Sequence, residues 1–292
     1  MMQELLQYLF TGITSGAIYA IIAVGYSMLY NSTELINFAQ GEFVMIGGMS
    51  LMTFWGVLKI PLPFSILLAV AVTALCGLIF ERLAIRTAKK DNHVVLIIIT
   101  VGASIFLRGA AMILWGKEPH SVAQFTSFPP INIGGAVIVF QSLWIIIGAL
   151  IIAVALDFFY RRSLTGKAMT ACAINMRAAR LTGIPAGFMV LLAFVISSST
   201  GAVAGSMIGP ITMCSYDMGT VLGLKGFCAA MLGGLGSLWG SLAGGIILGI
   251  LESLGAGYIS SGVKDATAFL ALLMILYFRP GGLFGKKDIK RF

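Results

Sequence analysis

Long uninterrupted runs of apolar residues are the feature that most restricts how this chain can fold. Eight or nine such runs follow one another, separated by short polar breaks, and a helix that crosses a bilayer needs about 20 predominantly apolar residues. Only 10% of the 292 residues are charged, against roughly 25% in an average soluble domain. The sequence therefore predicts an all-α polytopic membrane protein with eight or nine transmembrane helices, forming one domain over residues 1–292.

The expected spans follow these apolar runs. The first run is too long for a signal peptide and lacks its basic flank, so we interpret it as a span. The short run after Thr220 either crosses fully or re-enters and turns at Gly233 and Gly234, and the number of crossings depends on which is true. We expect nine crossings, over residues 5–29, 43–58, 64–80, 94–115, 137–159, 188–209, 220–232, 238–254 and 266–278.

Basic residues gather in three short segments, at 82–90, 161–180 and 279–291, and account for most of the net charge of +8. Lys and Arg in short loops mark the cytoplasmic side of a membrane protein. We therefore expect all three segments inside, including the tail 279–292, and the N-terminus outside. The positive charge is interpreted as membrane topology, so no nucleic-acid partner is expected.

A polar segment, NFAQGE at residues 37–42, interrupts the early spans. Asn37 is placed to cap a helix while Gln40 reaches back to the Asn37 backbone, and Glu42 lies near the positive end of the helix dipole. The same segment is also a candidate lining of a translocation route, because irregular backbone at membrane depth must face protein or water. The candidate route residues, which include a later lysine and its neighbour, are Asn37, Gln40, Gly41, Glu42, Lys225 and Gly226.

Two other patterns concern the spans themselves. Arg108, Lys225 and Glu252 are ionisable residues within expected spans, so each needs a partner or an aqueous surface, whether its role is structural or functional. Small residues recur toward the C-terminal end and predict a face on which helix backbones pack closely. These are Gly236, Gly240, Gly244, Gly245 and Gly249.

The segment 161–185 differs from an ordinary connection. It predicts a short independent helix with Met169, Cys172, Ala173 and Met176 on one face, ended by Gly183 and Pro185. One interpretation is an amphipathic helix that rests on the inner membrane surface. The other is a docking helix that inserts this apolar ridge into a groove of a cytoplasmic partner, with Arg177 and Arg180 at the rim.

Several kinds of chemistry have no motif in the sequence. It lacks a GxxxxGK[ST] phosphate loop, so ATP binding by that route is excluded. The four cysteines are scattered without a CxxC pair, so no metal site is expected. His93 and His120 lie near no serine or cysteine pattern for nucleophilic catalysis. We expect neither an enzyme nor a cofactor bound by this chain.

Five stretches, in this order and spacing, resemble the LivH-like permeases of branched-chain amino-acid ATP-binding-cassette (ABC) importers over essentially the whole chain. They are GAIYAIIAVGY at 16–26, INFAQGEFVMIG at 36–47, LTGI at 181–184, LKGF to GGLGS at 224–237, and FRPGGLFG at 278–285. The family often has His at the position of Gln40 and an acidic residue at Ile174 or Asn175. These departures leave the fold untouched but bear on substrate choice.

The resemblance implies a permease in the bacterial inner membrane that forms half of a pathway for branched-chain or related amino acids. The implied partners are a homologous second permease, two cytoplasmic ATPases that use ATP, and a periplasmic solute-binding protein. Alternatives are a permease for urea, short amides or another small polar solute, or a stand-alone secondary transporter. The segment 161–185 then becomes the coupling helix, with candidate contacts Gly166, Met169, Cys172, Ala173, Met176, Arg177, Arg180 and Gly183.

Overall fold

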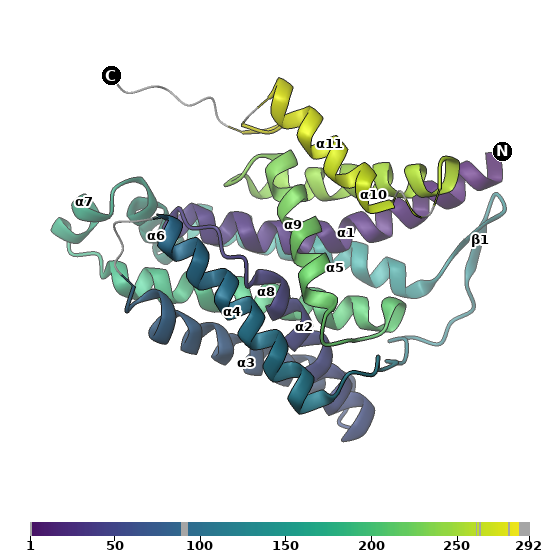
Figure 1. The fold of residues 1–292 in the computed structure, drawn as a ribbon, viewed down its shortest axis with the longest axis horizontal. Helices are drawn as coiled ribbons and strands as arrows, with labels where there is room; N and C mark the ends of the chain where they lie inside the picture. The colour runs from purple at the N-terminus through teal and green to yellow at the C-terminus, as the bar shows by residue number, and fades with distance from the viewer. Residues whose placement is uncertain (1, 89–92, 261, 263, 280, 286–292) are drawn as a thin grey trace.

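The computed structural model describes residues 2–88, 93–260, 262, 264–279 and 281–285, and helices dominate it (Figure 1). Six helices in this part of the chain are long and apolar enough to cross a membrane. The prediction of a helical multi-pass membrane protein is therefore confirmed. The six are α1 (Met2–Thr33), α3 (Leu62–Phe80) with its π-helical extension η2 (Glu81–Ile85), α4 (His93–Trp115), α5 (Phe140–Arg162), α8 (Ala186–Thr212) and α10 (Leu238–Tyr258).

Three shorter helices occupy the other expected spans. They are α2 (Gln40–Leu51), which continues as the π-helix η1 (Met52–Val57), then α9 (Met218–Gly233) and α11 (Lys264–Phe278). With 12, 16 and 15 residues, α2, α9 and α11 are shorter than the about 20 residues of a full span. The run after Thr220 is thus one continuous helix, and the chain turns only after it, at Gly234 with φ +100°.

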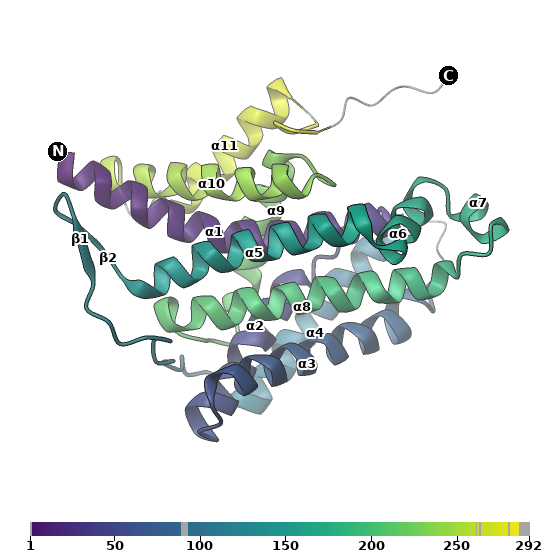
Figure 2. The same cartoon turned by 180° about the vertical axis from the view of Figure 1, so that it is seen from behind.

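The long helix α1 runs through the centre of the bundle. It packs along α10 in the antiparallel sense, since Ser253 near the end of α10 donates a hydrogen bond to the carbonyl of Tyr8 near the start of α1 (2.8 Å). On its other sides α1 contacts α5, α8 and α9. The helices α2 and α9 lie among these long helices, and α3 packs outside against α8 (Figures 1 and 2).

The predicted close-packing face on α10 is confirmed for four of its five glycines. A side chain at Gly245 would overlap Ala20 of α1, and one at Gly249 would overlap the backbone of Gly12 and Gly16. Gly240 and Gly244 face α9 in the same way. Gly236 is different, because it precedes α10 and forms part of a turn with φ +88°.

The segment between α4 and α5 contains a short hairpin. Strands β1 (Ile131–Ile133) and β2 (Ala136–Ile138) pair antiparallel, and the turn between them places Gly134 and Gly135 at positive φ, which glycine adopts without steric cost. The side chain of Gln7 bonds both backbone groups of Val137, at 2.7 and 3.2 Å. The hairpin is therefore fixed to the start of α1.

The molecule has two distinct ends. One carries the N-terminus and the hairpin, and the other carries α6 (Leu164–Ile174) and α7 (Met176–Leu181) (Figure 2). The described residues of the three basic segments lie at or near the second end. Lys89, Lys90 and the tail from residue 286 onward lie outside the described residues.

The packing of α1 on α10 predicts a strong effect of bulk at Gly249. Gly249→Leu should destabilise the protein by about 1–3 kcal/mol, because the backbones of the two helices would have to separate. Thermal unfolding in detergent measures this effect. Gly102→Leu on α4, where a side chain meets nothing within 4 Å, is the matched control. Equal stability of the two variants would contradict the packing argument.

Candidate functional site

The helix α2 begins inside the bundle rather than at its edge, and its first residue, Gln40, is fully buried. The Gln40 amide donates from Nε2 to the carbonyl of Ser197 on α8 (2.9 Å) and accepts at Oε1 from the Ser197 hydroxyl (2.8 Å). Asn37 accepts a hydrogen bond from the backbone N–H of Ala39 (3.0 Å). The predicted capping box is therefore wrong in both parts, because Ala39 is the residue before α2 and no side chain caps the helix, and the Gln40 side chain bonds α8 instead of returning to Asn37.

Glu42 lies at the meeting point of three helices. Its carboxylate is 1% exposed, and Oε1 accepts from Ser104 of α4 (2.9 Å) and from Thr220 of α9 (3.2 Å). Ser104 is at the midpoint of α4, whereas Glu42 and Thr220 are each the third residue of their helices. The N-terminal ends of two short helices thus meet beside the middle of a long one.

Arg108 follows Ser104 by one helical turn and belongs to the same group. Its Nη1 donates to Thr220 Oγ1 (3.2 Å), so one hydroxyl contacts both Arg108 and Glu42. Arg108 is half-buried, as are Ser104 and Thr220. We call Gln40, Glu42, Ser104, Arg108, Ser197 and Thr220 the polar centre.

The glycines of the candidate route are packing contacts. A side chain at Gly41 would overlap the backbone of Gly219 and Gly223 on α9, so only glycine lets α2 approach α9 this closely. Gly226 packs against Ile22 of α1, away from the polar centre. Gly41 therefore shapes the polar centre, and Gly226 serves the core.

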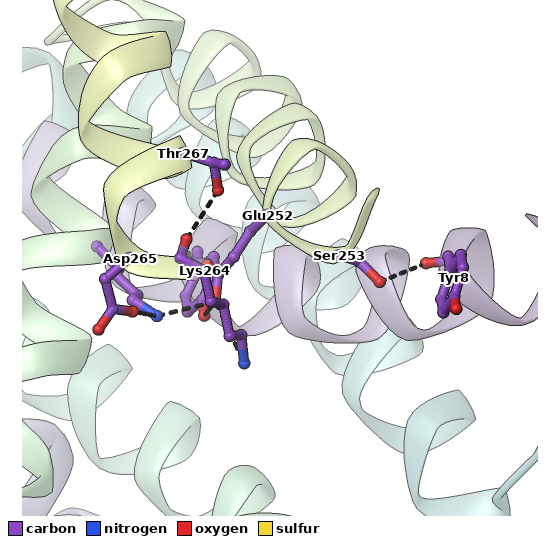
Figure 3. A network of polar contacts seen from close by, with 8 residues as sticks. Tyr8, Glu252, Ser253, Lys264, Asp265 and Thr267 are labelled. Carbon is purple, nitrogen blue, oxygen red and sulfur yellow. Dashed lines mark hydrogen bonds and ion pairs between the residues drawn. The ribbon is translucent and has the colours of Figure 1, made fainter. Parts of the chain in front are cut away.

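Lys225 belongs to a second polar cluster, where α9, α10 and α11 meet. Figure 3 labels three other members, Glu252, Lys264 and Asp265. Its ammonium lies 2.8 Å from Glu252 and 2.7 Å from Asp265, while Lys264 lies 3.3 Å from Glu252. The hydroxyl of Tyr19 also donates to Glu252 (3.2 Å). Two cations and two carboxylates neutralise one another here, which supplies the partners that the sequence required for Lys225 and Glu252.

The segment 161–185 forms two helices, α6 and α7, rather than the single helix expected. Asn175 separates them, because its side chain caps α7 by accepting from the N–H of Ala178 (2.9 Å). Met169 and Cys172 are buried where α6 contacts α1, α5 and α8, and Gly166 packs on the α5 backbone at Phe159. Burial also raises the pKa of the Cys172 thiol, against the opposing charge of Arg180.

The expectation of an apolar ridge that enters a partner's groove is corrected by this burial. Met169 and Cys172 face the chain's own helices, and Ala173 and Met176 are half-buried. The exposed surface instead carries the basic residues together with three strongly exposed apolar ones, Leu164 (85%), Ile174 (72%) and Leu181 (90%). The exposed members of the candidate set are Arg177, Arg180 and Gly183.

Sequence reasoning missed three members of the polar centre. Ser104 and Thr220 are single hydroxyl residues within apolar runs, and Ser197 is the first of four consecutive hydroxyl residues at 197–200; hydroxyls within helices most often bond the helix's own carbonyls. Only the spacing of Ser104 and Arg108, four residues apart and hence on one helix face, gave a usable signal. The partners across helices depend on the packing of α2 and α9, which no local pattern specifies.

The fold and the buried polar groups together indicate a class of protein. A multi-pass helical protein with short helices that start inside the bundle, and ionisable groups enclosed there, is typical of membrane transport proteins. The chain belongs to the family described as the permease component of the branched-chain amino acid transport system, whose family model matches residues 8–278.

Named relatives extend over nearly the whole chain. The permease protein BraD of the high-affinity branched-chain amino acid transport system of Pseudomonas aeruginosa is 33% identical, over 98% of this chain and 97% of its own length. LivH of Escherichia coli has the same identity and coverage. The fructose import permease protein FruF of Bifidobacterium longum is 26% identical, over 92% of this chain and 75% of its own length. This chain is thus a permease component of an ABC importer and not an enzyme.

The second cluster predicts a non-additive response to mutation. Lys225→Met should destabilise the protein by roughly 3 kcal/mol, the lower end of the range for removing one partner of a buried pair, because Lys264 remains near Glu252. The double variant Lys225→Met with Glu252→Leu should recover part of this loss, since no buried charge is then left unpaired. Unfolding in detergent measures both, and simple addition of the two single effects would contradict the pairing.

Proposed function

We propose that this chain forms half of the translocation pathway of an ATP-driven importer for branched-chain or related amino acids in the bacterial inner membrane. The observation that carries the proposal is the polar centre, where Glu42 and Arg108 are held at the midpoint of the bundle between α2, α4 and α9. Charged groups at that depth are costly unless they serve a pathway or a structural pairing. Family membership and the relatives BraD and LivH support the choice of substrate.

The proposed topology has nine crossings, with the N-terminus outside and the C-terminus inside. The six long helices cross fully, and α2, α9 and α11 supply the other three. The end of the molecule that carries α6 and α7 then faces the cytoplasm, because Arg161, Arg162, Lys167, Arg177 and Arg180 lie there. The contact of Ser32 at the end of α1 with Tyr160 near the end of α5 supports placing both ends on one side (2.8 Å).

The proposed partners are a homologous second permease, two cytoplasmic ATPases and a periplasmic solute-binding protein. ATP would be used by the ATPases, and this chain would bind no cofactor. The coupling surface consists of α6 and α7, with Arg177 and Arg180 exposed for an acidic partner. A cavity of about 520 Å³ beside α7, lined by Arg82, Arg86 and Arg180 among others, extends the basic surface.

The packing of α6 would transmit a force on this surface to the membrane helices. Because Gly166, Met169 and Cys172 fix α6 against α1, α5 and α8, a push from the ATPases would move α6 together with those helices. Such rigid-body movement of helix bundles is a common basis for switching between outward-open and inward-open states.

Charge reversal on α7 tests the coupling surface. Arg177→Glu with Arg180→Glu should abolish co-purification of the ATPases, because the basic surface would then repel an acidic one. Pulldown from native membranes measures it, with Lys117→Glu at the opposite end as the control. Undiminished recovery of ATPase subunits with the double variant would contradict docking at α7.

Labelling of single cysteines tests the topology. We expect a cysteine at Lys117 to react with an impermeant maleimide on intact spheroplasts, and one at Thr182 to react only after permeabilisation. Both positions are exposed, and the four native cysteines are replaced beforehand. Reaction at Thr182 on intact cells would place α7 outside and overturn the importer assignment.

A further inference from the structure

We propose that Glu42 and Arg108 form a subsite for the charged groups of a zwitterionic amino acid, with Glu42 binding the α-ammonium and Arg108 the α-carboxylate. This inference rests on the proposed function, since it names how that pathway recognises its substrate. It assigns opposite roles to two residues on different helices, α2 and α4, which meet only in the folded bundle.

The two charges are held close together without being paired. Thr220 donates to Glu42 Oε1 and accepts from Arg108 Nη1, both at 3.2 Å, and the ion pairs of the described residues do not include Glu42 with Arg108. An amino acid carries its ammonium and carboxylate on one carbon, so it needs two opposite charges side by side but not joined. The Lys225 cluster fails this requirement, because its charges contact one another at 2.7–2.8 Å.

Both groups retain unused hydrogen-bonding capacity. Glu42 Oε2 is buried and has no hydrogen-bond partner among the described residues, although burying an unsatisfied charged oxygen is costly. Arg108 has five N–H donors, and Nη1 bonds a neutral hydroxyl. An ammonium satisfies the first group and a carboxylate the second, and each bond would be charge-assisted.

The surroundings also suit an aliphatic side chain. Leu224 lies one turn beyond Thr220 on the same face of α9 and is 41% exposed. A ligand between α4 and α9 would therefore find charge at one end and apolar surface at the other.

The proposal separates amino acids from neutral solutes. Urea and short amides carry no full charges, so they would leave both Glu42 and Arg108 unsatisfied on entering the bundle. A substrate with only one charge would satisfy one residue and leave the other buried and unpaired. Discrimination between charged and neutral substrates is strong in such a site, because a wrong ligand leaves the polar groups of the site without hydrogen-bond partners, in addition to any that the ligand itself loses.

Protection of a reporter cysteine tests the subsite directly. Leu224→Cys, at a position that is 41% exposed and one turn from Thr220, is introduced into the complete importer without its native cysteines, in lipid nanodiscs and without the binding protein, with and without a non-hydrolysable ATP analogue. We expect L-leucine to slow maleimide reaction in at least one nucleotide state. Leucinamide, which lacks the carboxylate, and 4-methylpentanoate, which lacks the ammonium, should protect at concentrations roughly tenfold or more higher.

Variants then assign the two roles. Glu42→Gln and Arg108→Gln should each weaken protection by leucine roughly tenfold or more, and Arg108→Lys should restore part of it by returning the charge. Glu118→Gln, an exposed carboxylate in the loop after α4, should leave protection unchanged. Because the analogue series uses no substitution at Glu42 or Arg108, it tests the proposal even where those variants fold poorly.

ATP-driven leucine uptake by the complete importer, measured separately, tests the proposed function on its own. Uptake with no protection by leucine would overturn the subsite while the importer function stands. Equal protection by all three compounds, or protection that survives both Glu42→Gln and Arg108→Gln, would also overturn it. Absence of uptake with intact assembly would instead count against the proposed function.

Discussion

A bilayer offers no water to the backbone, and this constraint governs how the short helices of the fold are built. The first N–H groups of a helix lack partners within it, so a helix that starts inside a membrane needs other groups around its N-terminal end. At the start of α2, the backbone N–H of Ala39 donates to the Asn37 side chain and that of Gln40 donates to the Asn37 carbonyl, while Glu42 lies where the helix dipole favours negative charge. Glu42 then requires donors, which α4 and α9 provide.

Close backbone approach makes this arrangement possible. Glycine at Gly41 allows the start of α2 to touch α9, and glycine at Gly25 leaves space on α1 for the Gln40 amide. The same device joins α1 to α10 through Gly245 and Gly249. In lipid, where apolar burial gives little drive for helices to associate, small residues of this kind permit the tight contacts that hold helices together. Packing and polar satisfaction are therefore two aspects of one design, because the hydrogen bonds of the polar centre form only at these separations.

The sequence predicted the parts of this design that depend on local pattern. Within the described residues, apolar length located the six long helices and the shorter α2, α9 and α11. The glycine spacing predicted the close-packing face of α10 without its partner α1, and ionisable residues in spans located both polar clusters in outline. It did not predict that Lys225 and Glu42 belong to different clusters, because that depends on which face of α9 turns toward α2. It also did not predict that Met169 and Cys172 face inward, since an amphipathic pattern shows that a helix has an apolar face but not which surface covers it. Nor did it predict the hairpin, whose strands have only three residues each.

The two polar clusters differ in a way that suggests different physical roles. In the Lys225 cluster, opposite charges are in contact, so the free-energy cost of burying them is lowest while these ion pairs are intact. The pairs therefore hold α9, α10 and α11 together. In the polar centre, a hydroxyl stands between the charges and one carboxylate oxygen has no partner among the described residues. Because this oxygen is unsatisfied, any state of the protein in which a hydrogen-bond donor reaches it is stabilised. Helix movement around α2 and α9 would change access to it, so the closed cluster is suited to holding the bundle together and the polar centre to interacting with what passes through.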